Sequence, residues 1–211
     1  TGTRLLVGET EGLGDTGWLK TMFDFYTLEG ATALRGAMEQ FEEGILVINI
    51  VDMPIKCPVA PLEFAFLTDW YFHQRGIRDK VDIKFVTPLD GAFTRPVASK
   101  ALNGMLEDKG VELITEFSTG EVDGEQGCLT SFDERTVEFD LLVSIPVHGG
   151  AAFIDESEGL GDELGFVITD LHTLQATCKE NIFAIGDAAN LPTSKAGSVT
   201  HFEADILCDN V

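Results

Sequence analysis

The strongest constraint on the fold of this chain is an alternation of strand and helix patterns over residues 45–115. Its first strand, residues 45–51, is apolar apart from Asn49, as expected for a strand that is buried on both faces and belongs to a parallel sheet. The alternation predicts a doubly wound α/β unit with right-handed crossovers. The expected strands are residues 45–51, 81–87 and 111–114, and the expected helices are residues 62–74 and 96–110.

The expected helices differ in the faces that they bury. The segment that starts at Glu29 repeats apolar side chains at helical spacing, and Gly44 is placed to end that helix. Residues 62–74 are apolar almost all round, which predicts a buried helix. Pro96 opens a third helix. Its expected apolar face consists of Ala98, Ala101, Leu102, Met105 and Leu106.

The remainder of the chain has other patterns. Residues 121–139 contain two glycines and two polar breaks, which predict an antiparallel meander. Residues 141–147 have the pattern of another buried strand, and residues 155–164 form a loop rich in glycine and acidic residues. A last strand is expected at residues 181–185. The fold class is therefore α/β in three layers, with a parallel sheet and an antiparallel meander.

The charge of the chain excludes several classes of partner. Fourteen Lys and Arg residues stand against 36 Asp and Glu residues, which gives a net charge of −22. Nucleic acid is not an expected partner, because phosphate binding requires clustered basic residues.

No apolar stretch is long enough to span a bilayer. The four cysteines lack zinc-site spacing and the four histidines form no ligand cluster, so no metal site is expected.

The sharpest local motif is Asn181-Ile-Phe-Ala-Ile-Gly-Asp187, a strand pattern that ends at a glycine and an aspartate. Gly186 allows a ligand to approach the backbone closely, and the carboxylate of Asp187 can accept a hydrogen bond from a sugar hydroxyl. An aspartate here also suits the N-cap of a helix. The motif alone leaves the binding and the capping interpretations open.

A second motif, Lys56-Cys-Pro-Val-Ala-Pro-Leu-Glu63, follows the first strand of the alternation. In a nicotinamide-binding domain this turn carries glycines whose amides bind pyrophosphate, but no glycine lies between Asp52 and Arg75, and prolines remove backbone donors. The turn presents the thiol of Cys57 instead, and its neighbours favour the thiolate. An inert cysteine is the alternative. Glu63 either complements the helix dipole or accepts a proton.

Both motifs resemble segments of known flavoproteins. The segment that ends at Gly186-Asp187 resembles the second FAD-binding motif of the two-dinucleotide-fold flavoproteins, and the opening Thr1-Gly2 resembles the turn that ends their first FAD segment. Residues 56–63 resemble the cysteine segment of sulfide:quinone oxidoreductases. By this resemblance the chain is identified as an internal part of a sulfide:quinone oxidoreductase-like member of the FAD-dependent pyridine nucleotide-disulfide oxidoreductases.

The resemblance implies a Rossmann-like, FAD/NAD(P)-binding two-dinucleotide fold whose N-terminal FAD-binding βαβ unit is missing from this sequence. It also implies three domain segments. Residues 1–28 would be a remnant of the FAD-binding domain, and residues 29–150 would be a central domain, similar to an NAD-binding domain, that carries the cysteine loop. Residues 151–211 would return to the FAD-binding domain with the Gly-Asp motif.

The resemblance further implies roles for individual residues. Cys57 would carry sulfur beside FAD, Glu63 would accept a proton near sulfide or quinone, and Lys195 would stabilise negative charge on the reduced flavin. A solvated loop lysine is the alternative for Lys195. The parent enzyme would pass electrons from sulfide through Cys57 and FAD to a quinone. The expected FAD-binding residues are Thr1, Gly2, Gly186, Asp187 and Lys195.

The same comparison sets expectations for this chain by itself. Because it lacks a glycine-rich phosphate-binding turn, we expect it to bind neither FAD nor NADH and to be inactive alone. The family's membrane-binding C-terminal helices are absent from this sequence, so a cytoplasmic or peripheral membrane location and a homo-oligomer are both compatible with it. Two alternatives stay open. One is a related FAD enzyme, either the flavoprotein subunit of flavocytochrome c sulfide dehydrogenase or an NADH dehydrogenase. The other is a redox-inert binding domain of the same fold.

Overall fold

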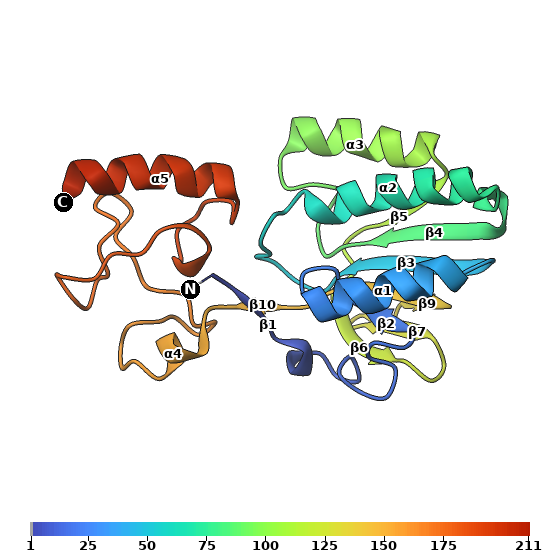
Figure 1. The fold of residues 1–211 in the computed structure, drawn as a ribbon, viewed down its shortest axis with the longest axis horizontal. Coiled ribbons are helices and arrows are strands. Elements are labelled where there is room, and N and C mark those ends of the chain that lie inside the picture. Colours follow the sequence, from blue (N-terminus) through green and yellow to red (C-terminus); the bar gives the residue numbers. More distant parts are fainter. Residues whose placement is uncertain (1) are drawn as a thin grey trace. The chain divides into compact units, whose positions relative to one another are not determined.

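The computed structural model describes residues 2–211, which form two compact units (Figure 1). The larger one, here called the sheet unit, consists of Val7–Met53 and Val59–Val147. The other, here called the C-terminal unit, consists of residues 2–6, Pro54–Pro58 and His148–Val211. Cys57 and its neighbours at residues 54–58 are therefore grouped with the Gly-Asp motif, although the two are far apart in the sequence.

The sheet unit contains a five-stranded parallel sheet in the order β2-β9-β3-β4-β5. The middle strand, β3, pairs with β9 on one side and with β4 on the other. Its residues 46–50 are all buried, as the unbroken apolar run predicts. The expectation of a buried parallel sheet is thus confirmed. The strands are β2 (Met22–Phe23), β3 (Gly44–Ile50), β4 (Val81–Val86), β5 (Val111–Ile114) and β9 (Leu141–Ile145).

The expected meander is also present, as a separate antiparallel sheet of β6 (Thr119–Asp123), β7 (Cys128–Ser131) and β8 (Thr136–Glu138). It packs on the parallel sheet, because Val47 of β3 and Val86 of β4 share one core cluster with Leu129 and Val137 of the meander. Neighbouring residues of a strand point to opposite faces, so Leu46 and Ile48 are directed to the other face of the sheet.

Three helices connect the strands of the sheet unit: α1 (Leu28–Gln40), α2 (Ala60–Arg75) and α3 (Pro96–Asp108). The start of α1 is fixed by Thr27, whose hydroxyl accepts a hydrogen bond from the amide of Gly30 at 2.9 Å. The end of α2 is fixed by Gly76, which has the left-handed conformation that glycine tolerates (φ 69°). Short 3-10 turns are η1 (Val7–Glu9) and η2 (Arg78–Lys80).

The expected role of Gly44 as a helix stop is wrong. Helix α1 ends at Gln40 with Phe41 as its C-cap, and Gly44 instead begins β3. Gly44 has a φ of 119°, and a Cβ atom there would lie 2.4 Å from Oδ2 of Asp140. The same carboxylate accepts a hydrogen bond from the amide of Ile45 at 2.7 Å. Glycine is therefore needed for the start of the strand and not for the end of the helix.

The expected apolar faces of two helices are only partly correct. Helix α2 is not buried all round, since Leu67 and Trp70 are 62% and 57% exposed. On α3, Leu106 is buried as expected, but Ala101 and Met105 are exposed. Helical periodicity alone does not show which part of an apolar surface a neighbouring element covers.

The C-terminal unit is mostly irregular. Strand β1 (Arg4–Leu5) pairs antiparallel with β10 (His148–Gly149), and the remaining elements are α4 (Ala152–Asp155), the 3-10 turn η3 (Gly186–Ala188) and α5 (Gly197–Asn210). The strand expected at residues 181–185 is wrong, because among the described residues Phe183 makes just an isolated bridge to Gln175. None of the helices in the described part of the chain could cross a membrane.

Candidate functional site

The turn η3 is the centre of the candidate site. Gly186 has a φ of 64°, and a Cβ atom there would lie 2.5 Å from Oγ1 of Thr200 in α5. Both the left-handed backbone and the close approach of α5 require glycine at this position. Asp187 does not cap a helix of ordinary length, because it lies within η3, which has three residues.

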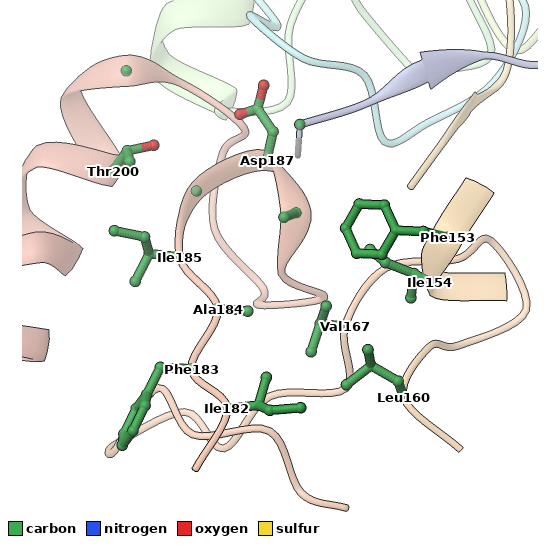
Figure 2. A pocket seen from close by; sticks show the side chains of 14 residues that line it. Phe153, Ile154, Leu160, Val167, Ile182, Phe183, Ala184, Ile185, Asp187 and Thr200 are labelled. Atoms are coloured by element: carbon green, nitrogen blue, oxygen red, sulfur yellow. The ribbon is translucent and has the colours of Figure 1, made fainter. Parts of the chain in front are cut away.

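A cavity of about 630 Å³ adjoins this turn (Figure 2). In Figure 2 the carboxylate of Asp187 lies at one end, away from Leu160 and Ile182. The volume is in the range of small-ligand sites, and apolar walls with few polar groups are typical of them. The lining residues are Gly2, Phe153, Ile154, Leu160, Val167, Ile182, Phe183, Ala184, Ile185, Gly186, Asp187, Ala188, Gly197 and Thr200.

The cysteine segment is joined to the same unit by backbone pairing. The amide of Cys57 donates to the carbonyl of Lys195 at 2.6 Å, and Lys56 and Lys195 form an isolated parallel bridge. Cys57 is partly buried and has a φ of 49°. A left-handed backbone is uncommon for a residue other than glycine, and such conformations cluster at functional sites.

The side chain of Lys195 is buried, so the solvated loop lysine that the sequence left open is excluded. Its Nζ donates to the carbonyls of Asp187 at 3.0 Å and Ala189 at 2.9 Å, and lies 3.6 Å from the ring centroid of Phe166. Burial lowers the pKa of Lys195, and the carboxylates of Asp187, Asp162 and Glu203 oppose that shift.

Glu203 is a site residue that the sequence did not single out. It is buried in α5, and its Oε2 accepts a hydrogen bond from the amide of Gly186 at 2.6 Å. Its other oxygen accepts from the hydroxyl of Thr193 at 3.2 Å. The one sequence signal for it is its position in the helix that follows the Gly-Asp motif.

The remaining residues that the sequence predicts for the site are Gly2, Thr1 and Glu63, and they do not all lie at the cavity. Gly2 lines the cavity, whereas Thr1 lies outside the residues that the structure describes. Glu63 is exposed in the first turn of α2 and belongs to the sheet unit. The structure therefore brings Gly2, Cys57, the Gly186-Asp187 turn and Lys195 into one unit, and it places Glu63 in the other.

The cavity suits part of a flavin nucleotide. The carboxylate of Asp187 can accept hydrogen bonds from the hydroxyls of a ribityl chain, and the apolar walls can cover a planar ring. The glycine pair Gly149-Gly150 before α4 does not form a phosphate site, because Cβ atoms there would lie 2.9 Å from the carbonyl oxygen of Leu164 and 1.7 Å from that of Gly165. These glycines serve close packing. No cluster of metal ligands is present among the described residues.

The fold belongs to the class of the FAD/NAD(P)-binding oxidoreductases. No protein-family model matches the chain. The mitochondrial sulfide:quinone oxidoreductase of Dictyostelium discoideum is 31% identical over 170 residues, which are 79% of this chain and 38% of that protein. The chain belongs to the sulfide:quinone oxidoreductase-like family, as the sequence motifs predict.

Two solved structures show the same fold over the whole chain. The sulfide:quinone oxidoreductase of the hyperthermophilic bacterium Aquifex aeolicus is 18% identical with a TM-score of 0.76, over 54% of its chain. A chain in the mitochondrial ATP synthase of Tetrahymena thermophila is 20% identical with a TM-score of 0.75, also over 54% of its chain. The present chain spans 38–45% of the length of the curated relatives that it matches.

Proposed function

We propose that this chain is part of a flavoprotein oxidoreductase that oxidises sulfide and delivers the electrons to a quinone. The observation that carries the proposal is the hydrogen bond between the amide of Cys57 and the carbonyl of Lys195, which joins the cysteine segment to the unit that holds the Gly186-Asp187 turn and its cavity. The presence of a thiol and of a carboxylate beside a cavity in one unit supports sulfide oxidation through a flavin.

The residues of this chain would contribute in distinct ways. Cys57 would bond the sulfur atom of sulfide as a persulfide, with release of two electrons and of the protons that sulfide carries. FAD, when bound, would take up these two electrons and pass them to the quinone. Asp187 would hold ribityl hydroxyls, Gly186 would give the turn the left-handed backbone that it needs, and Glu63 would accept a proton.

The experiment is sulfide-dependent reduction of bound flavin in the complete protein that contains this chain. We expect Cys57→Ala to abolish flavin reduction by sulfide while flavin content stays unchanged. Cys178→Ala is the matched control, because Cys178 is an exposed cysteine of the same unit. A Cys57→Ala protein that is reduced at the normal rate would contradict the proposal.

A second candidate is a redox-inert structural domain of the same fold. The fold similarity to a chain in an ATP synthase assembly is the observation that favours it. Flavin content separates the candidates, because an oxidoreductase of this kind must retain FAD in its complete form. Colourless complete protein, with no reduction by sulfide after reconstitution with FAD, would favour the structural role.

A further inference from the structure

The Gly186-Asp187 turn is held by a buried positive charge. The ammonium group of Lys195 donates to the carbonyls of Asp187, within the turn, and of Ala189, its C-cap residue. The ring of Phe166 packs on the same ammonium group, with 3.6 Å between Nζ and the ring centroid. The side chain of Lys195 is therefore held by two hydrogen bonds to the turn and its C-cap and by one contact with the Phe166 ring.

The backbone of the same residue holds the cysteine segment. The carbonyl of Lys195 accepts a hydrogen bond from the amide of Cys57, with an N···O distance of 2.6 Å. Because Cys57 has a left-handed backbone without being glycine, its conformation persists only where surrounding contacts impose it. This hydrogen bond is such a contact, so one residue links the thiol segment to the turn.

Glu203 binds the same turn in a different way. Its carboxylate accepts hydrogen bonds from the amide of Gly186 and from the hydroxyl of Thr193. Glu203 therefore contacts a backbone amide of the turn, whereas Lys195 contacts backbone carbonyls. The two hydrogen bonds of Glu203 thus join α5 to the turn and to Thr193. Glu203 therefore provides a comparison in which the turn is perturbed without removal of the ammonium group.

We propose that Lys195 is a positioning residue that couples the conformation of Cys57 to that of the Gly186-Asp187 turn. When the ammonium group holds the turn, the Lys195 backbone is fixed and Cys57 stays in its left-handed conformation. When the ammonium group is lost, both segments loosen together. The consequence for sulfide oxidation rests on the proposed function, whereas the coupling itself does not.

Amide hydrogen exchange of Cys57 and Gly186, measured by NMR on this chain, tests the coupling. Lys195→Met keeps an unbranched apolar side chain but removes the ammonium group. We expect the Cys57 amide to exchange about tenfold faster, which corresponds to about 1.4 kcal/mol. Lys195→Arg restores a cation with several donors and should recover most of the protection.

Two comparisons make the result specific. Lys179→Met removes an exposed lysine of the same unit and should change neither amide. Glu203→Gln should speed exchange at Gly186 and leave Cys57 within about twofold of the unmodified chain, a change equal to about 0.4 kcal/mol. Alkylation of Cys57 by iodoacetamide, resolved by peptide mass against Cys178, gives a second readout and should change with Lys195→Met alone.

The coupling is wrong if Lys195→Met leaves Cys57 exchange within twofold of the unmodified chain, or if Lys179→Met has the same effect. If Lys195→Met does not fold, Lys195→Gln keeps one donor group and is measured instead under the same criteria. Neither readout uses FAD or sulfide. Failure of sulfide-dependent flavin reduction would therefore remove the proposed function and leave the coupling to be judged on exchange alone.

Discussion

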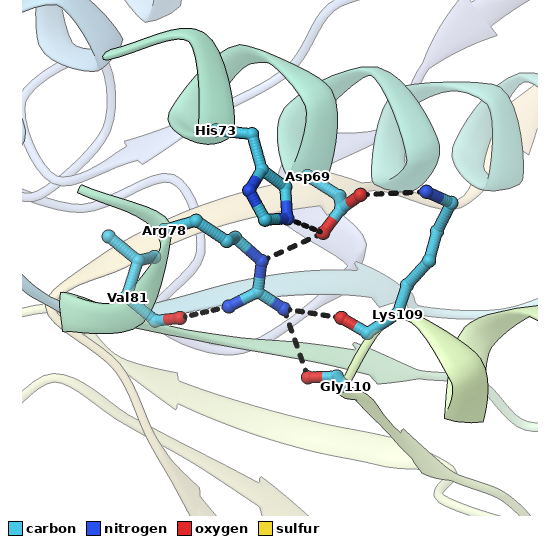
Figure 3. A network of polar contacts seen from close by, with 6 residues as sticks. All are labelled: Asp69, His73, Arg78, Val81, Lys109 and Gly110. Atoms are coloured by element: carbon cyan, nitrogen blue, oxygen red, sulfur yellow. Dashed lines mark hydrogen bonds and ion pairs between the residues drawn. The ribbon is translucent and has the colours of Figure 1, made fainter. Parts of the chain in front are cut away.

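Asp69, buried in α2, and Arg78 of η2 form an ion pair, with Nε of Arg78 2.8 Å from Oδ1 of Asp69 (Figure 3). The second carboxylate oxygen of Asp69 accepts a hydrogen bond from Nζ of Lys109 at 2.8 Å. Arg78 also donates to the carbonyls of Val81, Lys109 and Gly110. One carboxylate, 2% exposed, thus fastens α2 to the start of β4 and to the turn between α3 and β5.

Asp69→Asn should destabilise the sheet unit. The neutral amide leaves two cations facing each other without a compensating charge, and breaking a buried pair in this way costs about 3–5 kcal/mol. Lys109 is partly exposed, so we expect the low end, about 3 kcal/mol. Urea unfolding measures the loss. Asp79→Asn, at an exposed aspartate of η2, is the control and should change stability by less than about 0.5 kcal/mol.

The contribution of Asp69 should depend on pH. Burial alone would raise the pKa of Asp69, but the hydrogen bonds and charges of Lys109 and Arg78 outweigh burial and hold it below its ordinary value of 3.8. The unfolded chain therefore takes up the proton more readily than the folded chain. The stabilisation is complete above the unfolded pKa and is lost as the pH falls through the lower folded value.

Unfolding midpoints of the unmodified chain and Asp69→Asn, compared near neutral pH and in acid, test this dependence. The difference between the two should be large near neutral pH and should shrink as the pH falls below the ordinary aspartate pKa. A difference that is the same at both pH values would show that the loss comes from packing and not from the charge.

Gly44→Ala should destabilise the chain, whereas Gly36→Ala should not. At Gly44 the φ of 119° and the approach of Asp140 leave no room for a methyl group, and a left-handed backbone alone costs about 1–2 kcal/mol for other residues. At Gly36, within α1, a Cβ atom would meet open space, and alanine should gain about 0.5–1 kcal/mol. Chemical denaturation of both variants checks the opposite signs.

The sequence predicted the elements whose signal is local and continuous. The apolar run that forms β3, the helix opened by Pro96 and the glycine-interrupted meander all depend on patterns within a few residues of each other. The strand expected at residues 181–185 has an equally apolar pattern, but a strand also requires a neighbour for its backbone groups. Pattern alone does not supply that neighbour.

The candidate site was predictable to the extent that it follows a motif. Cys57, Gly186 and Asp187 were singled out from residue type and spacing, whereas Lys195 was implied by the family resemblance alone. The contacts of Lys195 with two carbonyls and the role of Glu203 were not, because both join segments through tertiary packing. A buried lysine and an exposed one have the same sequence signature when no periodic element surrounds them.

This chain alone should not retain FAD. Asp187 offers the ribityl hydroxyls one or two hydrogen bonds, each worth a net of about 0.5–1.5 kcal/mol. Micromolar affinity requires about 8 kcal/mol, and most of the remainder must come from phosphate binding at a glycine-rich helix N-terminus. Within residues 2–211 the one glycine pair that precedes a helix, Gly149-Gly150, is closed by the carbonyls of Leu164 and Gly165.

Incubation with excess FAD followed by desalting tests this expectation. The chain should be colourless, and Asp187→Ala should be indistinguishable from it, while the complete protein should retain flavin and lose affinity about threefold or more with the same substitution. Stoichiometric flavin in the desalted chain would mean that its phosphates bind elsewhere in these residues. In that case Asp187→Ala, measured on the chain itself, would show whether the cavity beside Gly186 contributes to the binding.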